Sequence, residues 1–219
     1  MVKEGIDNII RTYIENSKYK GNSGRWAFAN QVLYDLCADN IKHDNEHIIV
    51  TKIWLIGRSY AAAIERRNKS EEEHIEDYYY DKVAPAILKI GTELDKKISK
   101  IKVMEKSFSD TDVVTILETH YDLTKVFSEI TGMDKRSLAS KYLHFHCPDQ
   151  FFIYDSRAAG NIGKFAGKDR KHFNSICTDK MDQTYCDYYL KALQISRYAK
   201  EKFDKELSPR DIDNMIYYR

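Results

Sequence analysis

The chain has 219 residues, of which 42% are hydrophobic and 32% are charged, enough to bury the core of one large domain or of two small lobes. Its 9 glycines and 3 prolines are too few for the frequent tight turns of a sandwich or barrel of short strands. Lysine and arginine number 35 against 34 aspartates and glutamates, which excludes the basic excess of a non-specific DNA-coating protein. We therefore predict an all-α globular protein in which any nucleic-acid site is a local patch.

Sequence features that would send the chain to a membrane or an oxidising compartment are not found. No stretch approaches the ~20 apolar residues that span a bilayer, and the first ten residues lack the apolar block of a secretory signal. We expect a cytoplasmic protein with no membrane partner, whose oligomeric state stays open. The cysteines form no C-x-x-C pair, so we expect reduced thiols and no metal or other cofactor.

Apolar residues at helical spacing predict the first two helices. One covers residues 3–15, and the second runs from about 25 to 37. In the second helix Trp26 and Phe28 belong to the apolar stripe, so we expect both side chains to be buried.

The middle of the chain predicts three longer helices. Residues 46–67 are apolar on most sides for four turns, which indicates a helix through the core, with Gly57 allowing another helix to pack closely. A helix over about 77–100 should be interrupted or kinked near Pro85. After a loop and N-cap, residues 113–130 predict another amphipathic helix.

Residues 131–158, TGMDKRSLASKYLHFHCPDQFFIYDSRA, carry the strongest functional signal. A glycine turn leads into a helix, a proline ends it, an apolar run follows, and Asp155 occupies an N-cap position before the next helix. This order could bring Lys141 and Asp155 together although they are 14 positions apart. Farther on, residues 181–207 predict a helix with a tyrosine-rich face, and Pro209 begins a short last helix.

This order of elements resembles the core of the helix-hairpin-helix/GPD DNA glycosylase superfamily, and FFIYDSRA is its closest match. Together with IGRSYAAAIERR, the segment SKYLHFHCPDQFFIYDSRA looks like bacterial oxoguanine-glycosylase-like proteins, some of them neighbours of phage-defence genes. By this resemblance Asp155 matches the catalytic aspartate, and Lys141 is the best candidate for the lysine of the bifunctional members. Lys135 and Arg136 lie nearer the hairpin and are alternatives for that position.

The resemblance implies a single helical domain over residues 1–219, with about eight to ten helices and two lobes facing a cleft. One lobe would be a bundle over 25–130, and the other a glycosylase-like half over 131–219 packed with the N-terminal helix. It also implies DNA as the partner, excision of a damaged or modified base as the activity, and defence against phage as a role.

The chemistry that the resemblance assigns to these two residues is coherent. A base must be swung out of the duplex before it is excised, and cleavage of its bond builds positive charge on the sugar. A carboxylate at Asp155 would stabilise that charge, while an unprotonated Lys141 amine would attack the sugar and form a Schiff base that permits strand cleavage. Without the lysine, Asp155 activating water would suffice for base removal alone.

Two further groups of residues fit a DNA-binding role. Cations near the predicted site could contact phosphates, with helix N-termini and glycine amides assisting: Lys135, Arg136, Arg157, Lys164, Lys168, Arg170 and Lys171. Aromatic side chains of the same segment could stack on a displaced base: Tyr142, Phe145, Phe151, Phe152 and Tyr154.

Each of these assignments has a structural alternative. Asp155 could serve only as an N-cap, Lys141 could be a solvated surface lysine, the aromatic run could be core, and the cations could lie in a solvated loop. The protein would then be a catalytically inactive module that binds nucleic acid or protein. An outward Lys141 remote from Asp155 would favour that alternative.

Two histidine-containing segments could formally bind metal. HDNEH at residues 43–47 fits the inverted zinc-protease pattern, and His144, His146 and Cys147 lie close in sequence. The first lies at a polar helix start, and the two histidines of the second face different sides of a helix. We favour ordinary packing and hydrogen bonding for both.

Overall fold

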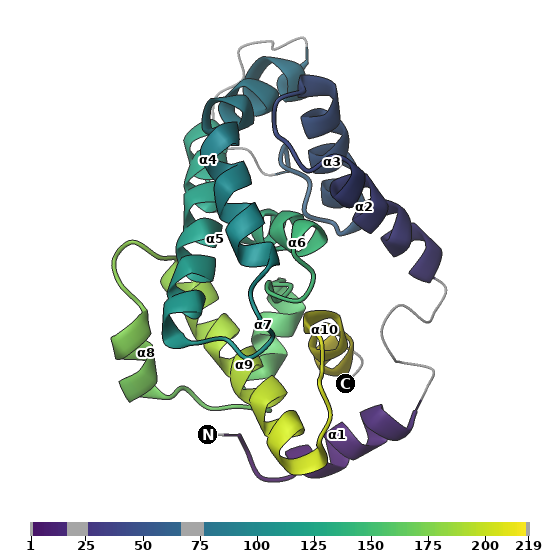
Figure 1. Ribbon diagram of the computed structural model, residues 1–219, viewed down its shortest axis with the longest axis vertical. Coiled ribbons are helices and arrows are strands. Elements are labelled where there is room, and N and C mark those ends of the chain that lie inside the picture. Colours follow the sequence, from purple (N-terminus) through teal and green to yellow (C-terminus); the bar gives the residue numbers. More distant parts are fainter. Residues whose placement is uncertain (1, 17–25, 67–76, 218–219) are drawn as a thin grey trace.

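The structure is a computed structural model that describes residues 2–16, 26–66 and 77–217 (Figure 1). Over these residues it contains ten α-helices, one π-helical turn and no β-strand, which confirms the predicted all-α fold. No described helix combines the length and the apolar character that a membrane span requires. The elements are α1 (Ile6–Glu15), α2 (Ala27–Asp39), α3 (Glu46–Ser59), η2 (Tyr79–Val83), α4 (Ala84–Lys102), α5 (Asp110–Thr131), α6 (Arg136–His146), α7 (Ser156–Ile162), α8 (Arg170–Ile176), α9 (Gln183–Phe203) and α10 (Pro209–Tyr217).

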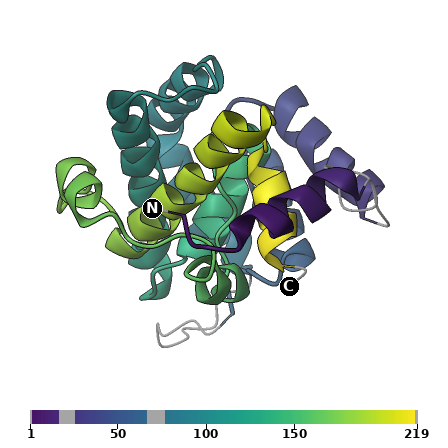
Figure 2. The same ribbon diagram turned by 90° about the horizontal axis from the view of Figure 1, so that it is seen from below.

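The helices divide around a central α6. Figure 1 shows α2, α3 and α4 in one half of the molecule, and α1, α8, α9 and α10 in the other. Helix α6 packs against α2, α3, α4 and α5, while α1 lies against α10 (Figure 2). Tyr13 of α1 donates to Asp211 at 2.7 Å, and Tyr198 of α9 donates to Asp7 at 2.7 Å. The functional division into lobes stays a prediction.

Local signals set the ends of α5 and the start of α4. Ser109 accepts a hydrogen bond from the Asp112 amide while the Asp112 carboxylate accepts one from the Ser109 amide, a reciprocal capping box. At the other end Gly132 has φ 63°, the left-handed conformation that glycine adopts without strain. Pro85 lies in the first turn of α4, directly after the π-helical turn, so the predicted interruption is confirmed.

The predicted helix over residues 46–67 is too long. Helix α3 ends at Ser59, Ala61 adopts a positive φ of 50°, and the Ala62 amide donates to the Gly57 carbonyl at 2.7 Å. The chain thus folds back over Gly57, where an added Cβ would come within 3.1 Å of the Ala63 Cα. The small residue at 57 accommodates the chain's own next turn rather than another helix.

Burial of the first residues of α2 was also predicted wrongly. Trp26 is 73% exposed and Phe28 83% exposed, whereas Leu33 and Cys37 farther along the helix are buried. Helix α2 packs against α3 and α6, and its buried residues all lie beyond the second turn. The apolar character of a residue at the end of a helix therefore does not by itself predict that the residue is buried.

The loop before α3 is anchored on α4 by His43. Its Nδ1–H and its backbone amide donate to Asp95, at 2.5 and 3.2 Å, and its Nε2 accepts from the Tyr142 hydroxyl at 2.7 Å. The loop approaches α4 so closely that a Cβ at Gly91 would lie far inside van der Waals contact with the His43 carbonyl oxygen. His43 therefore joins the loop to both α4 and α6.

We expect Gly91→Ala to lower the free energy of unfolding by about 1–3 kcal/mol, because the new methyl group must push the loop away from α4. Gly160→Ala is the matched control: no described atom lies within 4 Å of its added Cβ, and helix propensity alone should stabilise it by up to about 1 kcal/mol. Urea denaturation measures both. Equal stability of Gly91→Ala and the wild type would contradict the close approach.

Candidate functional site

Lys141 lies on the most deeply buried helix of the fold. Every residue of α6 from Leu138 to His146 is buried, and Lys141 itself is only 2% exposed. Lysine is almost never so buried unless its amine is paired, and here Lys52 and Lys135 are also buried, each with its amine on a backbone carbonyl. The position of Lys141 is therefore not that of a solvated surface lysine.

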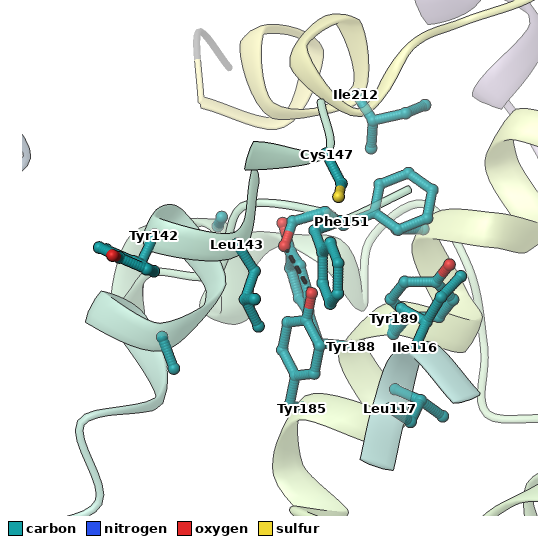
Figure 3. Close-up of a cluster of buried hydrophobic side chains, with 14 of the residues drawn as sticks. Ile116, Leu117, Tyr142, Leu143, Cys147, Phe151, Tyr185, Tyr188, Tyr189 and Ile212 are labelled. Carbon is teal, nitrogen blue, oxygen red and sulfur yellow. Dashed lines mark hydrogen bonds between the residues drawn. The ribbon is translucent and has the colours of Figure 1, made fainter. Parts of the chain in front are cut away.

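The segment between α6 and α7 is extended but pairs with no strand. Buried carbonyl groups must still find donors, and here side chains of the neighbouring helices supply them. Figure 3 shows Tyr185, Tyr188 and Tyr189 of α9 gathered beside Phe151. The hydrogen bonds run from Tyr189 to the Gln150 carbonyl (3.0 Å), from His144 to Phe151 (2.8 Å), from Tyr185 to Phe152 (2.8 Å) and from Tyr188 to Ile153 (2.7 Å).

The end of this segment is tied directly to α6. The Tyr154 amide donates to the Ser140 hydroxyl oxygen at 3.0 Å, and that hydroxyl lies 3.5 Å from the Tyr154 carbonyl. One residue later, Asp155 caps α7 by accepting the Ala158 amide at 2.7 Å. These contacts hold the start of α7 against α6, and the charge of Asp155 acts on the Lys141 amine, but the two side chains form no hydrogen bond or ion pair with each other.

The Lys141 amine is held by neutral oxygens. Nζ donates to Ser137 Oγ at 2.9 Å and to the Tyr60 carbonyl at 3.3 Å, and it lies 5.9 Å from the centre of the Tyr60 ring. Burial lowers the pKa of this amine below its usual value, and the Arg210 charge acts in the same direction. The carboxylates of Asp155 and Asp213 oppose the shift.

Two charged residues of α10 complete the surroundings of the amine. Arg210 Nη1 lies 3.5 Å from Asp213 Oδ2, and the guanidinium carbon lies 5.4 Å from the centre of the Tyr60 ring. The Tyr60 ring thus has the Arg210 and Lys141 cations within 6 Å. We refer to Lys141, Asp155, Arg210 and Asp213 as the Lys141 cluster.

A chain of hydrogen bonds links Arg210 to the extended segment. Its Nη2 donates to the Tyr34 hydroxyl at 3.2 Å, and that hydroxyl donates to His144 Nε2 at 2.7 Å. Since the Phe151 carbonyl can only accept, the proton of the imidazole must be on Nδ1. Burial holds the pKa of His144 well below its usual range, so the ring is neutral and serves as a connector.

Arg210, alone among the four residues of the Lys141 cluster, lines a pocket of about 420 Å³. Phe145, one helical turn after Lys141, forms part of the pocket wall. The lining combines aromatic rings with polar groups: Gln31, Tyr34, Ala38, Lys102, His144, Phe145, His146, Pro148, Asp149, Ser208 and Arg210.

The aromatic residues predicted to stack on a base occupy different places. Phe145 lines the pocket, with its ring 4.8 Å from that of Tyr34, and Tyr154 is half-buried. Tyr142 is fully buried with its hydroxyl on His43, while Phe151 and Phe152 are core residues packed near α9. Phe145 is thus the predicted aromatic residue that borders the pocket lined by Arg210.

The two cations nearest the hairpin are engaged within the protein. Lys135 is buried, and its amine donates to the Arg66 carbonyl at 2.5 Å. Arg136 Nε lies 2.7 Å from the buried Asp182 carboxylate, and its Nη2 lies 3.2 Å from Asp134. Both side chains therefore join structural elements in this conformation.

The five downstream cations are all exposed. Arg157 lies over the Tyr217 ring at 4.7 Å, Lys164 donates to Asn161 at 2.8 Å, and Lys168 lies 3.4 Å from the centre of the Phe173 ring. Arg170 and Lys171 form the first turn of α8. These side chains are placed along α7, α8 and the loop between them.

The histidines of the two segments that could formally bind metal differ in their surroundings: His43 and His144 are hydrogen-bonded inside the protein, whereas the buried Nε2 of His146 has no partner among the described residues. Within the described ranges, no group of three His, Cys, Asp or Glu side chains is arranged to hold a metal ion. His43 is buried on Asp95 whereas His47 is exposed, so the two ends of HDNEH do not converge. All four cysteines are free thiols.

Arg210 and Asp213 were not predicted from the sequence. They lie in RDIDNMIYY, where the apolar positions Ile212, Met215 and Ile216 are buried in the core. A charged pair spaced three residues apart lies on one face of a helix, and such a face is usually solvated. Here the packing of α10 turns that face toward the interior, which the sequence does not indicate.

Comparisons with protein-family models, with curated proteins and with solved structures find no match to this chain.

We expect Tyr188→Phe and Tyr185→Phe each to lower the free energy of unfolding by about 1–3 kcal/mol, because each change leaves a buried carbonyl of the extended segment without a donor. Tyr121→Phe on α5 is the matched control, because the Tyr121 contact with Lys125 is made by the face of the ring, which phenylalanine keeps. This substitution should change the free energy of unfolding by no more than about 0.5 kcal/mol. Guanidinium denaturation gives all three values. Wild-type stability of both α9 variants would contradict the role of the hydroxyl groups.

Proposed function

We propose that this protein is a DNA glycosylase-like enzyme that excises a damaged or modified base, with Lys141 as the nucleophile and Asp155 as the carboxylate that stabilises the sugar cation. The observation that carries this proposal is the burial of the Lys141 amine within the electrostatic influence of Asp155, the carboxylate that caps α7. The resemblance of the segment from Lys141 to Asp155 to the glycosylase superfamily supports the same assignment.

The surroundings of Lys141 favour nucleophilic chemistry. An amine attacks a carbon only when it is unprotonated, and burial lowers the pKa of this amine. Its hydrogen-bond partners, Ser137 and the Tyr60 carbonyl, are neutral, so they do not lock it as an ammonium in a direct ion pair. An outward lysine would have favoured the catalytically inactive binding module.

Asp155 is oriented by its cap. Oδ1 accepts the Ala158 amide, which fixes the carboxylate at the start of α7 and leaves Oδ2 to face the developing charge. Tyr154, held by Ser140, sets the position of the backbone immediately before it. The side chain can therefore act without having to be reorganised first.

The pocket and the exposed cations supply the remaining parts that excision requires. The 420 Å³ pocket is lined by Arg210 and by the aromatic residues Tyr34 and Phe145, and an aromatic lining suits a planar ring. The exposed cations of α7, α8 and their loop are of the type that contacts phosphates. From the resemblance we add to the proposal a bacterial role against modified foreign DNA, and from the sequence features a cytoplasmic location.

The enzymatic assignment predicts a covalent complex with DNA. We expect borohydride to trap the wild-type protein on a duplex that carries the base it excises. The Lys141→Gln variant should form no trapped complex, because it lacks the amine. The Asp155→Asn variant should excise the base about 100-fold more slowly, or slower still. Lys89→Gln, at an exposed site on α4, is the matched lysine control and should behave as wild type.

The same assay has a predicted pH dependence. Trapping should rise with pH as Lys141 loses its proton, and its midpoint should lie below the usual lysine value because burial lowers the pKa of the amine. A panel of damaged and phage-modified duplexes that yields neither excision nor a trapped complex would exclude an enzyme of this type.

Replacing the exposed cations should weaken DNA binding without changing the fold. We expect Lys164→Ala, Arg170→Ala and Lys171→Ala together to lower affinity and to reduce the slope of log K against log salt by up to about 3, since each lost phosphate contact removes about 0.9. The control is a triple alanine variant of exposed lysines on α4: Lys89, Lys96 and Lys100. An equal loss in both triple variants, by fluorescence anisotropy, would contradict a local patch.

A further inference from the structure

The 420 Å³ pocket has the size of a site for a small ligand. Pockets of that kind usually measure about 300–1,000 Å³ and combine an apolar lining with a few polar groups. The walls of this one come from α2, from the last residue of α4, from the end of α6 and the turn after it, and from the start of α10. Several elements far apart in the sequence therefore build one cavity.

His146 is a buried residue of this wall whose ring finds no hydrogen-bond partner in the described fold. It is only 4% exposed, its Nε2 is inaccessible to solvent and unpartnered, and the described residues supply no hydrogen bond to its Nδ1 either. His144, two positions earlier, uses both of its ring nitrogens. A buried imidazole without a partner is costly, and this one lies in the wall of a pocket, where a ligand can supply the partner.

Arg210, in the same wall, has donor groups left over. A guanidinium carries five N–H groups. Nε and Nη2 donate to the Tyr34 hydroxyl at 3.4 and 3.2 Å, and Nη1 donates to Asp213 at 3.5 Å. One N–H group on each of Nη1 and Nη2 thus has no partner among the described residues, although Arg210 is only 8% exposed. A ligand with hydrogen-bond acceptors would satisfy them.

The charges of the lining favour an anion. Lys102, the last residue of α4, is exposed and forms no ion pair or hydrogen bond with a described residue. Asp149 is the carboxylate of the lining, and it is paired with Lys106, which lies outside the lining, at 3.5 Å. Both histidines of the lining are neutral, because burial holds their pKa values well below the usual range. Lys102 and Arg210 therefore give the pocket an excess of positive charge.

The remaining part of the lining suits an aromatic ring. The rings of Tyr34 and Phe145 lie 4.8 Å apart, and Ala38 and Pro148 add apolar surface. Aromatic side chains bind bases with little dependence on base identity, and lysine and arginine are the usual partners of phosphate groups. The pocket thus places an aromatic lining and two phosphate-binding side chains around one cavity.

We propose that the 420 Å³ pocket binds a whole nucleotide, with its base against Tyr34 and Phe145 and its phosphate on Lys102 and Arg210. The choice of a nucleotide among planar anions rests on the proposed function. The inference extends that function, because a free deoxynucleoside monophosphate should occupy the pocket without any DNA.

Calorimetry on the wild-type chain tests the two halves of the ligand separately. The probes are the four deoxynucleoside monophosphates, the four deoxynucleosides and inorganic phosphate. We expect at least one monophosphate to bind with one-to-one stoichiometry, about tenfold or more tighter than its nucleoside and than phosphate, because charge-assisted hydrogen bonds hold the phosphate. Equal affinities of a monophosphate and its nucleoside, or no binding of any monophosphate, would overturn the inference.

A lysine variant tests the phosphate contact. Lys102→Gln should lower monophosphate affinity by about tenfold and leave nucleoside affinity unchanged, since it removes a charge and nothing that contacts the base. Lys100→Gln is the matched control, because Lys100 is exposed near the end of the same helix but does not line the pocket. An equal loss in the two variants would show a general effect of charge and would overturn the inference.

Filling the cavity tests the location. Ala38 and Asp39 are both exposed at the end of α2, but only Ala38 lines the pocket, so neither Ala38→Trp nor Asp39→Trp disturbs a buried residue. We expect Ala38→Trp to abolish binding of monophosphate and nucleoside alike, and Asp39→Trp to bind both as the wild type does. Binding that survives Ala38→Trp would place the ligand elsewhere and overturn the inference.

The inference and the proposed function can fail separately. A wild type that excises and traps a base but binds no free monophosphate would overturn the inference and leave the enzymatic assignment in place. A wild type that binds a monophosphate in the pocket but neither excises nor traps any base would support the nucleotide site and contradict the proposed function.

Discussion

The four carbonyl groups of residues 150–153 are the constraint on which the arrangement of the site depends. These residues are buried and join no sheet, so their carbonyl oxygens must be satisfied by side chains. Three tyrosines of α9 and His144 of α6 donate to these carbonyls, and the Ser140 hydroxyl accepts the amide of the next residue, Tyr154. Together these bonds hold the segment at a fixed register between α6 and α9, and Asp155 follows it directly.

That register relates two residues that are far apart in sequence. Ser140 fixes Tyr154, which holds the start of α7 against α6, and the Asp155 charge then acts on the Lys141 amine. Lys141 is then enclosed by Tyr60 and by the charged residues of α10. Burying charged groups in this way costs stability unless they are paired, and Asp213 is paired on only one oxygen. The cost is explained if the cluster serves a reaction.

The signals that the sequence carried clearly were local ones. Ser109, Gly132, Pro85 and Asp155 each act on the backbone within a few residues, and each ends or begins a helix where the pattern predicts. The all-α fold followed from composition and periodicity. Lys141 could be placed on a helix and linked to Asp155 by resemblance, but its burial depends on contacts with α3 and α10.

What the sequence could not predict depends on tertiary contacts. The tyrosine-rich face of α9 could be recognised in the sequence. Its role depends on the backbone that it contacts, and the carbonyls that its hydroxyl groups bind lie 33 to 39 positions earlier in the chain. The apolar residues after Gly57 suggested a continuing helix, but Ile64 is buried in a turn and not in a helix. Arg210 and Asp213 follow a pattern typical of a solvated helix face, and only the packing of α10 turns them toward the amine.

The pKa of the Lys141 amine in the wild type and in Asp155→Asn tests the central claim most directly, because it reports on the placement of the two residues without any activity. Asparagine keeps the cap of α7 and removes only the charge. The ¹⁵N resonance of Nζ should titrate below the usual lysine value in the wild type and at still lower pH in Asp155→Asn, since the Asp155 charge raises the pKa of Lys141. An ordinary lysine pKa that Asp155→Asn leaves unchanged would contradict the account.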